Sequence, residues 1–350
     1  MHKAISVIQF KLEAGMIMKH PEWGMEDRLL LAQLSPDRST VTLKSGVYPM
    51  RDSNFPTVDP ADPFRLTPEE ELLVEKLHRS FTISERLRRH MRILFDHGNL
   101  FKITNSNLMY HASVPLNEDG SLKEVSLRGQ RLKGRRLLEE IEMLMRAAFN
   151  PASPQEIRDY GVDYYWYLWC GPESPLFDKH AMTTFERYFV ADQETHKEEK
   201  GNYFRLRDRE DICDMIMDEF GVTGTHRHII NGHVPVKVGK GESPVKANGK
   251  LMVIDGGFAK AYHNETGIAG YTLVFHSRGF VLVQHEPFSS REEVVREGSD
   301  IVSTTQLVEL SQSRMRVRDT DKGLELQSQI DELRELLYAY RHGLISPHAL

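Results

Sequence analysis

The sequence predicts an α+β protein, in which helices and antiparallel β-hairpins occupy separate stretches of the chain. Apolar residues recur at helical spacing near both ends, alternating patterns flank several short turns, and strand-like runs gather after Leu100. We expect three regions on this basis. They are a helical and hairpin accessory region over 1–99, a core with inserted helices and an aromatic wall over 100–310, and a helical tail over 311–350.

Composition limits the classes of function. The chain has 350 residues, of which 40% are hydrophobic, so it can bury a large core. Its formal charge of −6 gives no reason to expect nucleic acid or an anionic membrane as partner. Cys170 and Cys213 are too few for a disulfide framework and lie at no metal-site spacing, so we expect buried thiols in a reducing cytoplasm. The longest apolar run, Tyr164 to Cys170, is too short to span a membrane.

The first region begins with a predicted helix. Apolar residues over 5–16 mark one face of this helix, and its abrupt start suggests that Met1 was once internal. Alternation over 28–48 predicts a β-hairpin, and a Pro-rich run over 51–64 predicts an extended connection. Thr67-Pro68-Glu69-Glu70 is a capping box that starts a helix running to about His78.

An Arg-rich helix is predicted over 84–97 and ends at Gly98. Its arginines suit a solvated face better than a phosphate site, because a basic helix face is usually just exposed to water. The following Asp96-His97-Gly98-Asn99 superficially resembles a metal-binding loop. No strand precedes it, so we interpret it as a capping segment.

Residues 100–221 mix strands with helices. Two short apolar runs around Asn105-Ser106-Asn107 predict a hairpin whose second strand delivers His111 to its carboxyl end. Three helices are predicted over 131–149, over 154–160 with an end at Gly161, and over 211–220. The aromatic run over 163–177 fits a structural wall, and a sugar-stacking surface is the alternative.

The stretch over 229–271 has the features of an active-site edge. His233 follows a short apolar run and precedes Val-Pro, as His111 does in the earlier strand. Ligands of open sheets bind beyond the carboxyl ends of strands, so the two histidines could meet at one site. The alternative is two separate buried histidines, each bonded to a backbone carbonyl. His226 and His228 alternate along the preceding strand, and we interpret them as surface histidines.

Lysines and glycines follow His233 in a connection that suits a phosphorylated ligand or, alternatively, a solvated loop. They are Lys237, Lys246, Lys250, Gly239, Gly241 and Gly249. Neither GxxxxGK[ST] nor GxGxxG occurs, so no motif supports nucleotide binding. A turn at Asn248-Gly249 leads into a predicted strand over 250–254, and the runs 269–277 and 279–288 predict a further hairpin.

The tail predicts one amphipathic helix over 322–340. Its apolar residues recur at helical spacing and are Leu326, Ile330, Leu333, Leu337 and Tyr340. Such a helix packs on its own domain or on a second copy, so a homo-oligomer is a further option.

Several segments resemble the bacterial class III fructose-1,6-bisphosphatases: LMYHASVPLNEDGSL, DYYWYLWCGPESPLFDKHAMTTFERYF, INGHVPVKVGKGESPVKANGKLMVIDGGFAKAY and TGIAGYTLVFHSRG. The resemblance extends over essentially the whole chain. It implies a calcineurin-like metallophosphoesterase fold, a sandwich of two mixed sheets flanked by helices. It also implies hydrolysis of fructose 1,6-bisphosphate in gluconeogenesis by water activated between two metals, with Mn²⁺ as cofactor.

The resemblance extends to single residues. His111 and His233 match metal ligands of the family, whereas no catalytic residue is assigned. The candidate contacts to the sugar bisphosphate are Asn231, Lys237, Lys246 and Asp255.

The chain departs from the family in one respect. The motifs GDxHG, GDxxDRG and GNH followed by an acid, which the family carries in an amino-terminal portion, do not occur. The chain therefore resembles the carboxyl-terminal part of such an enzyme, with a separate amino-terminal half or none. Two histidines alone supply no bridging carboxylate, so we expect weak Mn²⁺ binding and negligible hydrolysis by the isolated chain. A non-catalytic sugar-phosphate-binding or assembly module and an inactive remnant are the alternatives.

Overall fold

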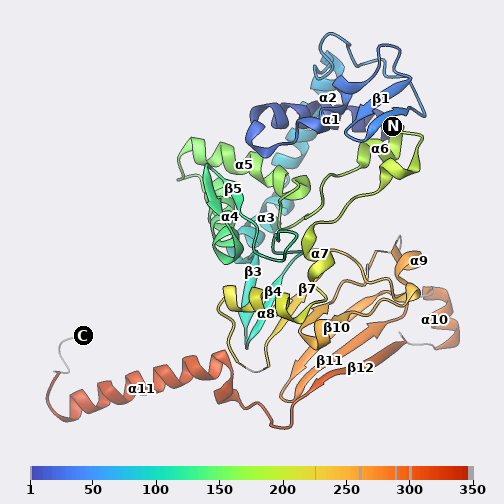
Figure 1. Ribbon diagram of the computed structural model, residues 1–350. Helices are drawn as coiled ribbons and strands as arrows, with labels where there is room; N and C mark the ends of the chain where they lie inside the picture. Colours follow the sequence, from blue (N-terminus) through green and yellow to red (C-terminus); the bar gives the residue numbers. More distant parts are fainter. Residues whose placement is uncertain (1, 225, 260–261, 288–289, 299–301, 346–350) are drawn as a thin grey trace. The chain divides into compact units, whose positions relative to one another are not determined.

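The computed structural model describes residues 2–224, 226–259, 262–287, 290–298 and 302–345, and these form two compact units. Unit 1 comprises Met1–Leu100 and His111–Leu206, and unit 2 comprises Phe101–Tyr110 and Arg207–Leu350. The chain therefore leaves unit 2 after one short hairpin, completes unit 1, and then returns (Figure 1). The predicted α+β class is confirmed, since helices and sheets alternate in no regular βαβ order.

The elements of unit 1 are mainly helical. They are α1 (His2–Lys19), η1 (Pro21–Trp23), η2 (Glu26–Arg28), η3 (Leu30–Gln33), β1 (Thr40–Leu43), β2 (Gly46–Pro49), α2 (Pro68–Thr82), α3 (Glu85–His97), β5 (Val125–Leu127), β6 (Gln130–Leu132), α4 (Gly134–Phe149), α5 (Gln155–Cys170), α6 (Thr184–Phe189), η4 (Gln193–His196) and α7 (Asn202–Leu206).

The elements of unit 2 include both larger sheets. They are β3 (Phe101–Thr104), β4 (Asn107–Tyr110), α8 (Glu210–Glu219), β7 (His228–Asn231), η5 (Val238–Lys240), β8 (Val245–Lys246), η6 (Ala247–Gly249), β9 (Leu251–Val253), α9 (His263–Thr266), β10 (Gly270–His276), β11 (Gly279–His285), α10 (Arg291–Glu297), β12 (Ser303–Leu310), η8 (Val317–Asp319) and α11 (Asp321–Arg341).

This division differs from the predicted regions. The boundary near residue 100 recurs, but residues 111–206 belong to unit 1 and not to a core over 100–310. The physical reason is that Phe185 and Phe189 of α6 pack in one hydrophobic cluster with Val7 of α1 and Val41 of β1. The tail over 311–350 belongs to unit 2.

The start of α2 follows the predicted capping box. Thr67 N donates to Glu70 Oε2 at 2.9 Å, and Glu70 N donates to Thr67 Oγ1 at 3.3 Å. The Glu70 carboxylate also accepts from Nζ of Lys11, a fully buried side chain of α1, at 2.7 Å. One carboxylate therefore caps α2 and joins it to α1.

The predicted hairpin over 28–48 is partly wrong. Strands β1 and β2 form a hairpin with Thr40 opposite Pro49, but Leu30–Gln33 is a 3₁₀ turn. Leu30 and Leu31 are both buried, which two successive residues of a half-exposed strand do not achieve because their side chains point to opposite faces.

The predicted helix end at Gly161 is also wrong, because α5 continues through Gly161 to Cys170. A Cβ on Gly161 would lie 2.5 Å from Cβ of Ala148 in α4, so the glycine permits close approach of the two helices. Most of the aromatic run is therefore helical, with Tyr164 and Tyr167 buried against Trp23. This packing fits the interpretation as a structural wall.

Unit 2 contains a five-stranded mixed sheet in the order β3-β4-β7-β9-β8. The predicted hairpin of β3 and β4 is confirmed, with Asn105 and Ser106 at positive φ in its two-residue turn. Strands β4, β7 and β9 are parallel neighbours, with Leu108 opposite Ile229. Parallel strands buried in this way lie at the centre of the sheet, with β3 and β8 at its edges.

A second, antiparallel sheet of unit 2 has the order β10-β11-β12 (Figure 1). It meets the mixed sheet at His228 of β7, whose ring lies 4.9 Å from that of Phe280 and whose Nε2 lies 2.9 Å from Glu309 Oε2. The interpretation of His228 as a surface histidine is therefore wrong, since 7% of the residue is exposed. Burial lowers the pKa of His228, against the opposing charge of Glu309.

We expect Gly161→Ala to destabilise the protein by about 1–3 kcal/mol, because the new methyl group overpacks the contact of α5 with α4. Gly15→Ala is the matched control. Gly15 lies within α1 with no atom within 4 Å of an added Cβ, so this change should stabilise by up to about 1 kcal/mol. Urea unfolding followed by tryptophan fluorescence measures both, and a Gly161→Ala protein as stable as Gly15→Ala would contradict the close approach.

Candidate functional site

The strands that precede the two candidate histidines are neighbours in the mixed sheet. Because β4 and β7 are parallel, Tyr110 and Asn231 end them at the same sheet edge, as the sequence predicted. His233 follows at this edge within unit 2. His111 begins the segment 111–206, which belongs to unit 1. The edge of the sheet within unit 2 therefore comprises His233 and the residues that follow β7 and β9.

His233 has a strained backbone. Its φ is +68°, and Val234 N donates to Gly232 O at 2.9 Å across it, which makes a γ-turn centred on a non-glycine residue. Its Nε2 atom is buried. Strain of this kind costs about 1–3 kcal/mol and persists where the surrounding structure enforces it, often at functional sites. The turn therefore marks His233 as the most distinctive residue of the edge.

Asn231 and Asp255 lie on either side of this turn. Asn231 ends β7, is buried, and accepts Ile254 N at its backbone oxygen at 2.9 Å. Asp255 Oδ1 accepts Gly257 N at 3.0 Å, and its backbone oxygen accepts Val236 N at 2.8 Å. Both predicted contacts are thus brought to one edge, where their backbone groups fix the loops that follow β7 and β9.

The two predicted lysines converge on Glu242, which the sequence did not single out. Lys237 N donates to Glu242 Oε2 at 3.0 Å, while Lys246 Nζ lies 3.6 Å from Glu242 Oε1. Lys246 also lies 3.4 Å from Asp208, and Lys237 Nζ lies 3.1 Å from Glu265. Each ammonium group is therefore close to a carboxylate of the same unit, and a phosphate group would have to compete with it.

Arg207 adds a buried cation beside Glu242. Its Nη2 lies 3.8 Å from Glu242 Oε1, and 4% of the residue is exposed. Nothing local in the sequence distinguishes Arg207 or Glu242, since they come from the start of the second segment of unit 2 and from a surface loop. Glu242 lies shortly before β8, the outermost strand of the sheet, so its closeness to Arg207 depends on the tertiary fold.

The segment after His111 is fixed within unit 1. His111 is exposed, whereas Ala112, Ser113 and Val114 are buried and Ser113 N donates to Pro175 O at 3.1 Å. Asp178 is buried as well, and its Oδ2 has no hydrogen-bond partner in the part of the chain that the structure describes. Burial raises the pKa of the Asp178 carboxyl to about 6, and the Ser113 hydroxyl opposes this only in part.

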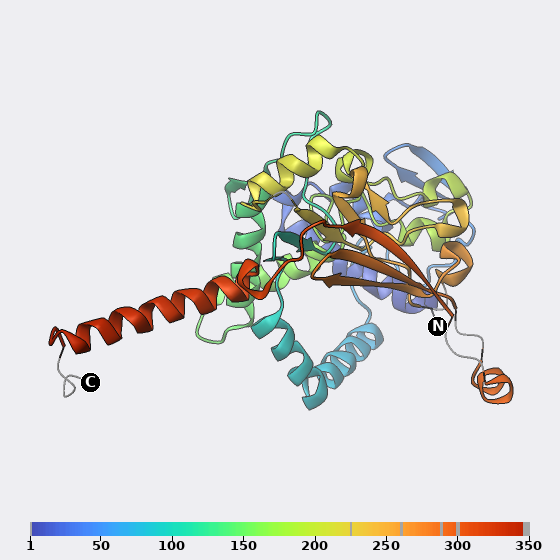
Figure 2. The ribbon, with the colours of Figure 1, turned by 90° about the horizontal axis from the view of Figure 1, so that it is seen from below.

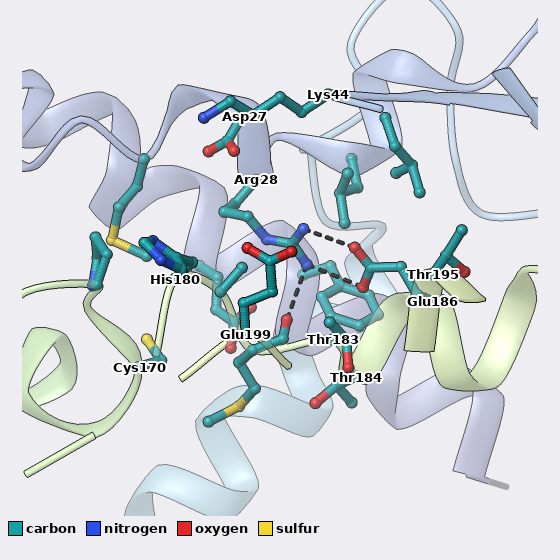
Figure 3. A pocket seen from close by; sticks show the side chains of 18 of the residues that line it. Asp27, Arg28, Lys44, Cys170, His180, Thr183, Thr184, Glu186, Thr195 and Glu199 are labelled. Atoms are coloured by element: carbon teal, nitrogen blue, oxygen red, sulfur yellow. Dashed lines mark hydrogen bonds and ion pairs between the residues drawn. The ribbon is translucent and has the colours of Figure 1, made fainter. Parts of the chain in front are cut away.

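Unit 1 also contains a pocket of about 750 Å³, between α1, the β1–β2 turn, the end of α5 and residues 180–199. Figure 3 shows the Arg28 guanidinium facing the Glu186 carboxylate, which it holds through two hydrogen bonds of 2.6 and 3.0 Å. Among the described residues, the carboxylates that line the pocket are Glu13, Asp27, Glu186, Glu194 and Glu199, and the lysines and arginines are Arg28, Lys44 and Lys197.

This excess of carboxylates disfavours a sugar bisphosphate in the pocket. Each phosphate group carries a charge of about −1.5 to −2 at neutral pH, and Arg28 is already occupied by Glu186. Burial raises the pKa of Glu13, and the hydrogen bond from Gln9 and the charge of Arg28 oppose this shift only in part. The pocket therefore does not replace the sheet edge as the candidate site for a phosphorylated ligand. Sequence reasoning missed it because its residues come from five separate stretches, 9–17, 24–30, 43–48, 166–172 and 180–199.

The residues that the structure describes do not make up a two-metal site. Within the described ranges there is no group of three or more His, Cys, Asp or Glu side chains arranged to hold a metal ion. Hard divalent cations such as Mn²⁺ favour carboxylate ligands, and the edge supplies His233 with Asp255 already engaged in a turn. We therefore derive no catalytic step through a metal from this chain.

Both cysteines are free and buried, as predicted. Burial raises the pKa of the Cys213 thiol to about 12 and that of Cys170 further, so neither is a reactive thiolate at neutral pH. No helix within the described residues is long and apolar enough to cross a membrane.

The mixed sheet and the strained histidine at the end of its central strand define an α+β protein with a candidate ligand-binding edge. Comparison with known protein families identifies the family to which the chain belongs. The chain belongs to the family described as Firmicute fructose-1,6-bisphosphatase, whose model matches residues 1–342. The family resemblance drawn from the sequence is thereby confirmed.

Curated relatives carry the name fructose-1,6-bisphosphatase class 3. That of Phocaeicola vulgatus is 59% identical over 351 aligned positions, which cover 100% of this chain and 53% of the relative. Those of Bacteroides thetaiotaomicron and Clostridium botulinum are 59% and 53% identical, covering 99% of this chain and 52% of each relative. The chain thus spans about half the length of the relatives it matches. No solved structure matches it.

We expect Asp178→Asn to stabilise the protein at pH 7 by about 2–3 kcal/mol, because the folded state holds this carboxyl protonated up to about pH 6 whereas the unfolded state loses its proton near 3.8. The contribution of Asp178 to stability is therefore full below pH 3.8 and is lost as the pH rises to 6. Denaturant unfolding at pH 4 and pH 7 measures the difference between wild type and variant.

Asp119→Asn is the control for this test. The exposed Asp119 accepts hydrogen bonds from Ser121, which lower the pKa of its carboxyl, so removal of its charge should give no gain at pH 7. An Asp178→Asn protein that gains no stability relative to wild type between pH 4 and pH 7 would show that the carboxyl is ionised in the folded state.

Proposed function

We propose that the chain forms part of a class III fructose-1,6-bisphosphatase, which hydrolyses fructose 1,6-bisphosphate to fructose 6-phosphate and phosphate. The family match over residues 1–342 and relatives that are 53–59% identical support this activity. The structural observation that carries the proposal is the strained turn at His233 on the carboxyl edge of the parallel strands.

The chain corresponds, in this proposal, to the carboxyl-terminal part of the enzyme. The motifs GDxHG, GDxxDRG and GNH do not occur in it, and it covers about half of each relative. The remaining metal ligands then come from the part of the enzyme that this chain does not cover. The two sheets of unit 2, which meet at His228 and Phe280, are the candidates for the calcineurin-like sandwich of the complete enzyme.

Mn²⁺ is the proposed cofactor, with His111 and His233 as the ligands from this chain. Asn231 and Asp255 are proposed to contact the sugar. Lys237 and Lys246 are proposed to contact a phosphate group, which would meet Arg207 and Lys246 together if it displaced the Glu242 carboxylate that lies 3.6–3.8 Å from both. Phosphate binding is therefore expected to be weaker than at an uncompensated pair of cations.

The proposed setting is the cytoplasm, with fructose 1,6-bisphosphate as a small-molecule substrate in gluconeogenesis. Two buried free thiols are compatible with a reducing compartment. The competing functions are a non-catalytic module that binds sugar phosphates or assembles with another chain, and an inactive remnant.

We expect the isolated chain to release negligible phosphate from fructose 1,6-bisphosphate with Mn²⁺, because it lacks the carboxylates that would share the charge of two metals. Co-expression with the part of the Phocaeicola vulgatus relative that this chain does not cover should restore Mn²⁺-dependent release. His233→Ala should then lower kcat/KM by about 100-fold or more, whereas His90→Ala, an exposed histidine of α3, should leave it unchanged.

Each other outcome selects a different function. Substantial turnover by the isolated chain would contradict the incomplete site, and full activity of His233→Ala would contradict its role as a ligand. Thermal stabilisation by fructose 1,6-bisphosphate without turnover in the co-expressed protein would indicate a binding module. A broad, weakly cooperative melt of the chain would indicate a remnant.

A further inference from the structure

The carboxyl-terminal helix α11 carries an apolar stripe that the rest of unit 2 does not cover. Of its residues, all of which the structure describes, only Gly323 is buried. Leu326, Ile330, Leu333 and Leu337 are 41–65% exposed, and Tyr340 continues the same face. A contiguous exposed stripe of large apolar side chains on a soluble helix is the mark of an interaction surface.

The first turn of the helix is fixed to the β3–β4 hairpin of unit 2. Asp321 N donates to Asn105 Oδ1 at 2.9 Å, and Asn105 N donates to Asp321 Oδ2 at 2.7 Å, so the β3–β4 turn holds the start of the helix. From there α11 runs away from the sheets of unit 2, as both views show (Figures 1 and 2). Its stripe is therefore open along about 20 Å of helix.

The spacing of the stripe identifies the kind of partner that fits it. The steps between these five apolar residues are four, three, four and three, which is the spacing of a coiled-coil seam. Leu336 flanks this seam, and Leu324 and Tyr338 lie on other faces of the helix. Leu326, Leu333 and Tyr340 take the d positions of the heptad, and Ile330 and Leu337 take the a positions. Such a seam needs another helix with the same repeat.

We propose that α11 is a dimerisation helix, which forms a parallel two-stranded coiled coil with α11 of a second copy of this chain. A second copy supplies the matching repeat by symmetry, since a two-fold interface uses the same patch on both subunits. Ile330 at an a position with leucines at the flanking d positions is the combination that favours two parallel strands.

The parallel register also satisfies the flanking side chains. In a parallel pair each of the five apolar residues packs against the same residue of the second copy. In an antiparallel pair, where a positions pack against d positions, only four of the five find an apolar partner. The parallel register places Arg334 beside Gln329 of the second copy and Arg341 beside Leu336, so no like charges face each other. The acidic side chains Glu325, Asp331, Glu332 and Glu335 lie at outward positions, where Gln327 and Arg334 bond Asp331 at about 3 Å.

Sedimentation of the full chain from about 5 to 200 μM tests the proposal, because a seam of two heptads should give a concentration-dependent dimer. Leu333→Glu should raise the dimer dissociation constant by about 100-fold or more, since it sets two charges in the seam. Leu324→Glu is the matched control. Leu324 is 63% exposed against 65% for Leu333, and it lies nine residues earlier on the opposite face, so its dimer should persist.

A second variant tests the parallel register. Ile330→Cys should give a disulfide-linked dimer when oxidised glutathione accepts the two electrons and protons of the paired thiols, since equal a positions meet only in a parallel coil. The native thiols Cys170 and Cys213 are buried and do not compete. A wild-type chain that stays monomeric at about 200 μM, a Leu333→Glu dimer as stable as wild type, or an Ile330→Cys protein that does not cross-link would overturn the proposal.

Discussion

The parallel pairing of β4 with β7 is the constraint on which the rest of this structure depends. Leu108 lies opposite Ile229, yet the whole of residues 111–206 comes between these strands in the chain. Closing so long a connection has an entropic cost that local helices and hairpins do not have. The fully buried Leu108, Ile229 and Leu251 offset this cost at the centre of the sheet. The same pairing brings the ends of β4 and β7 to one edge, where the strained turn of His233 follows.

Elements with a local chemical signal were predictable from the sequence. The capping box at Thr67 depends on residues three apart and formed as expected. The hairpin predicted around Asn105-Ser106-Asn107 also formed, with Asn105 and Ser106 as its turn. Gly161 was misjudged, because a glycine that ends a helix and one that permits a close helix contact look the same in sequence. His228 was misjudged because its burial depends on Phe280 and Glu309 of a distant hairpin and strand. The sequence indicated that the ends of β4 and β7 lie at one edge of the sheet. It did not indicate that the Glu242 carboxylate accepts the backbone N–H of Lys237 and lies beside the Lys246 ammonium group.

Charge distinguishes the pocket of unit 1 from the sheet edge of unit 2 as a candidate site for a phosphorylated ligand. The pocket of unit 1 has more carboxylates than cations, and its arginine is held by Glu186. At the edge of unit 2, Lys246 and Arg207 share the Glu242 carboxylate, and Lys246 also lies beside Asp208. These cations are not outnumbered by the carboxylates beside them, so the edge is the better match to a phosphorylated ligand. Membership of the fructose-1,6-bisphosphatase family and a span of about half of each relative fit an edge that is one side of a larger site. The γ-turn fixes the backbone of His233, and carboxylates lie close to Lys246 and Arg207.

Hydrogen exchange of the backbone amides in β4 and β7 tests the central pairing most directly. If Asn107–Tyr110 and His228–Asn231 are parallel neighbours at the centre of one sheet, their amides should exchange slowly and lose protection together as denaturant is raised. The amides of the outer strand β12 should exchange earlier. Rapid exchange in β4 while β7 stays protected would contradict the pairing, and with it the meeting of the two strand ends at one edge.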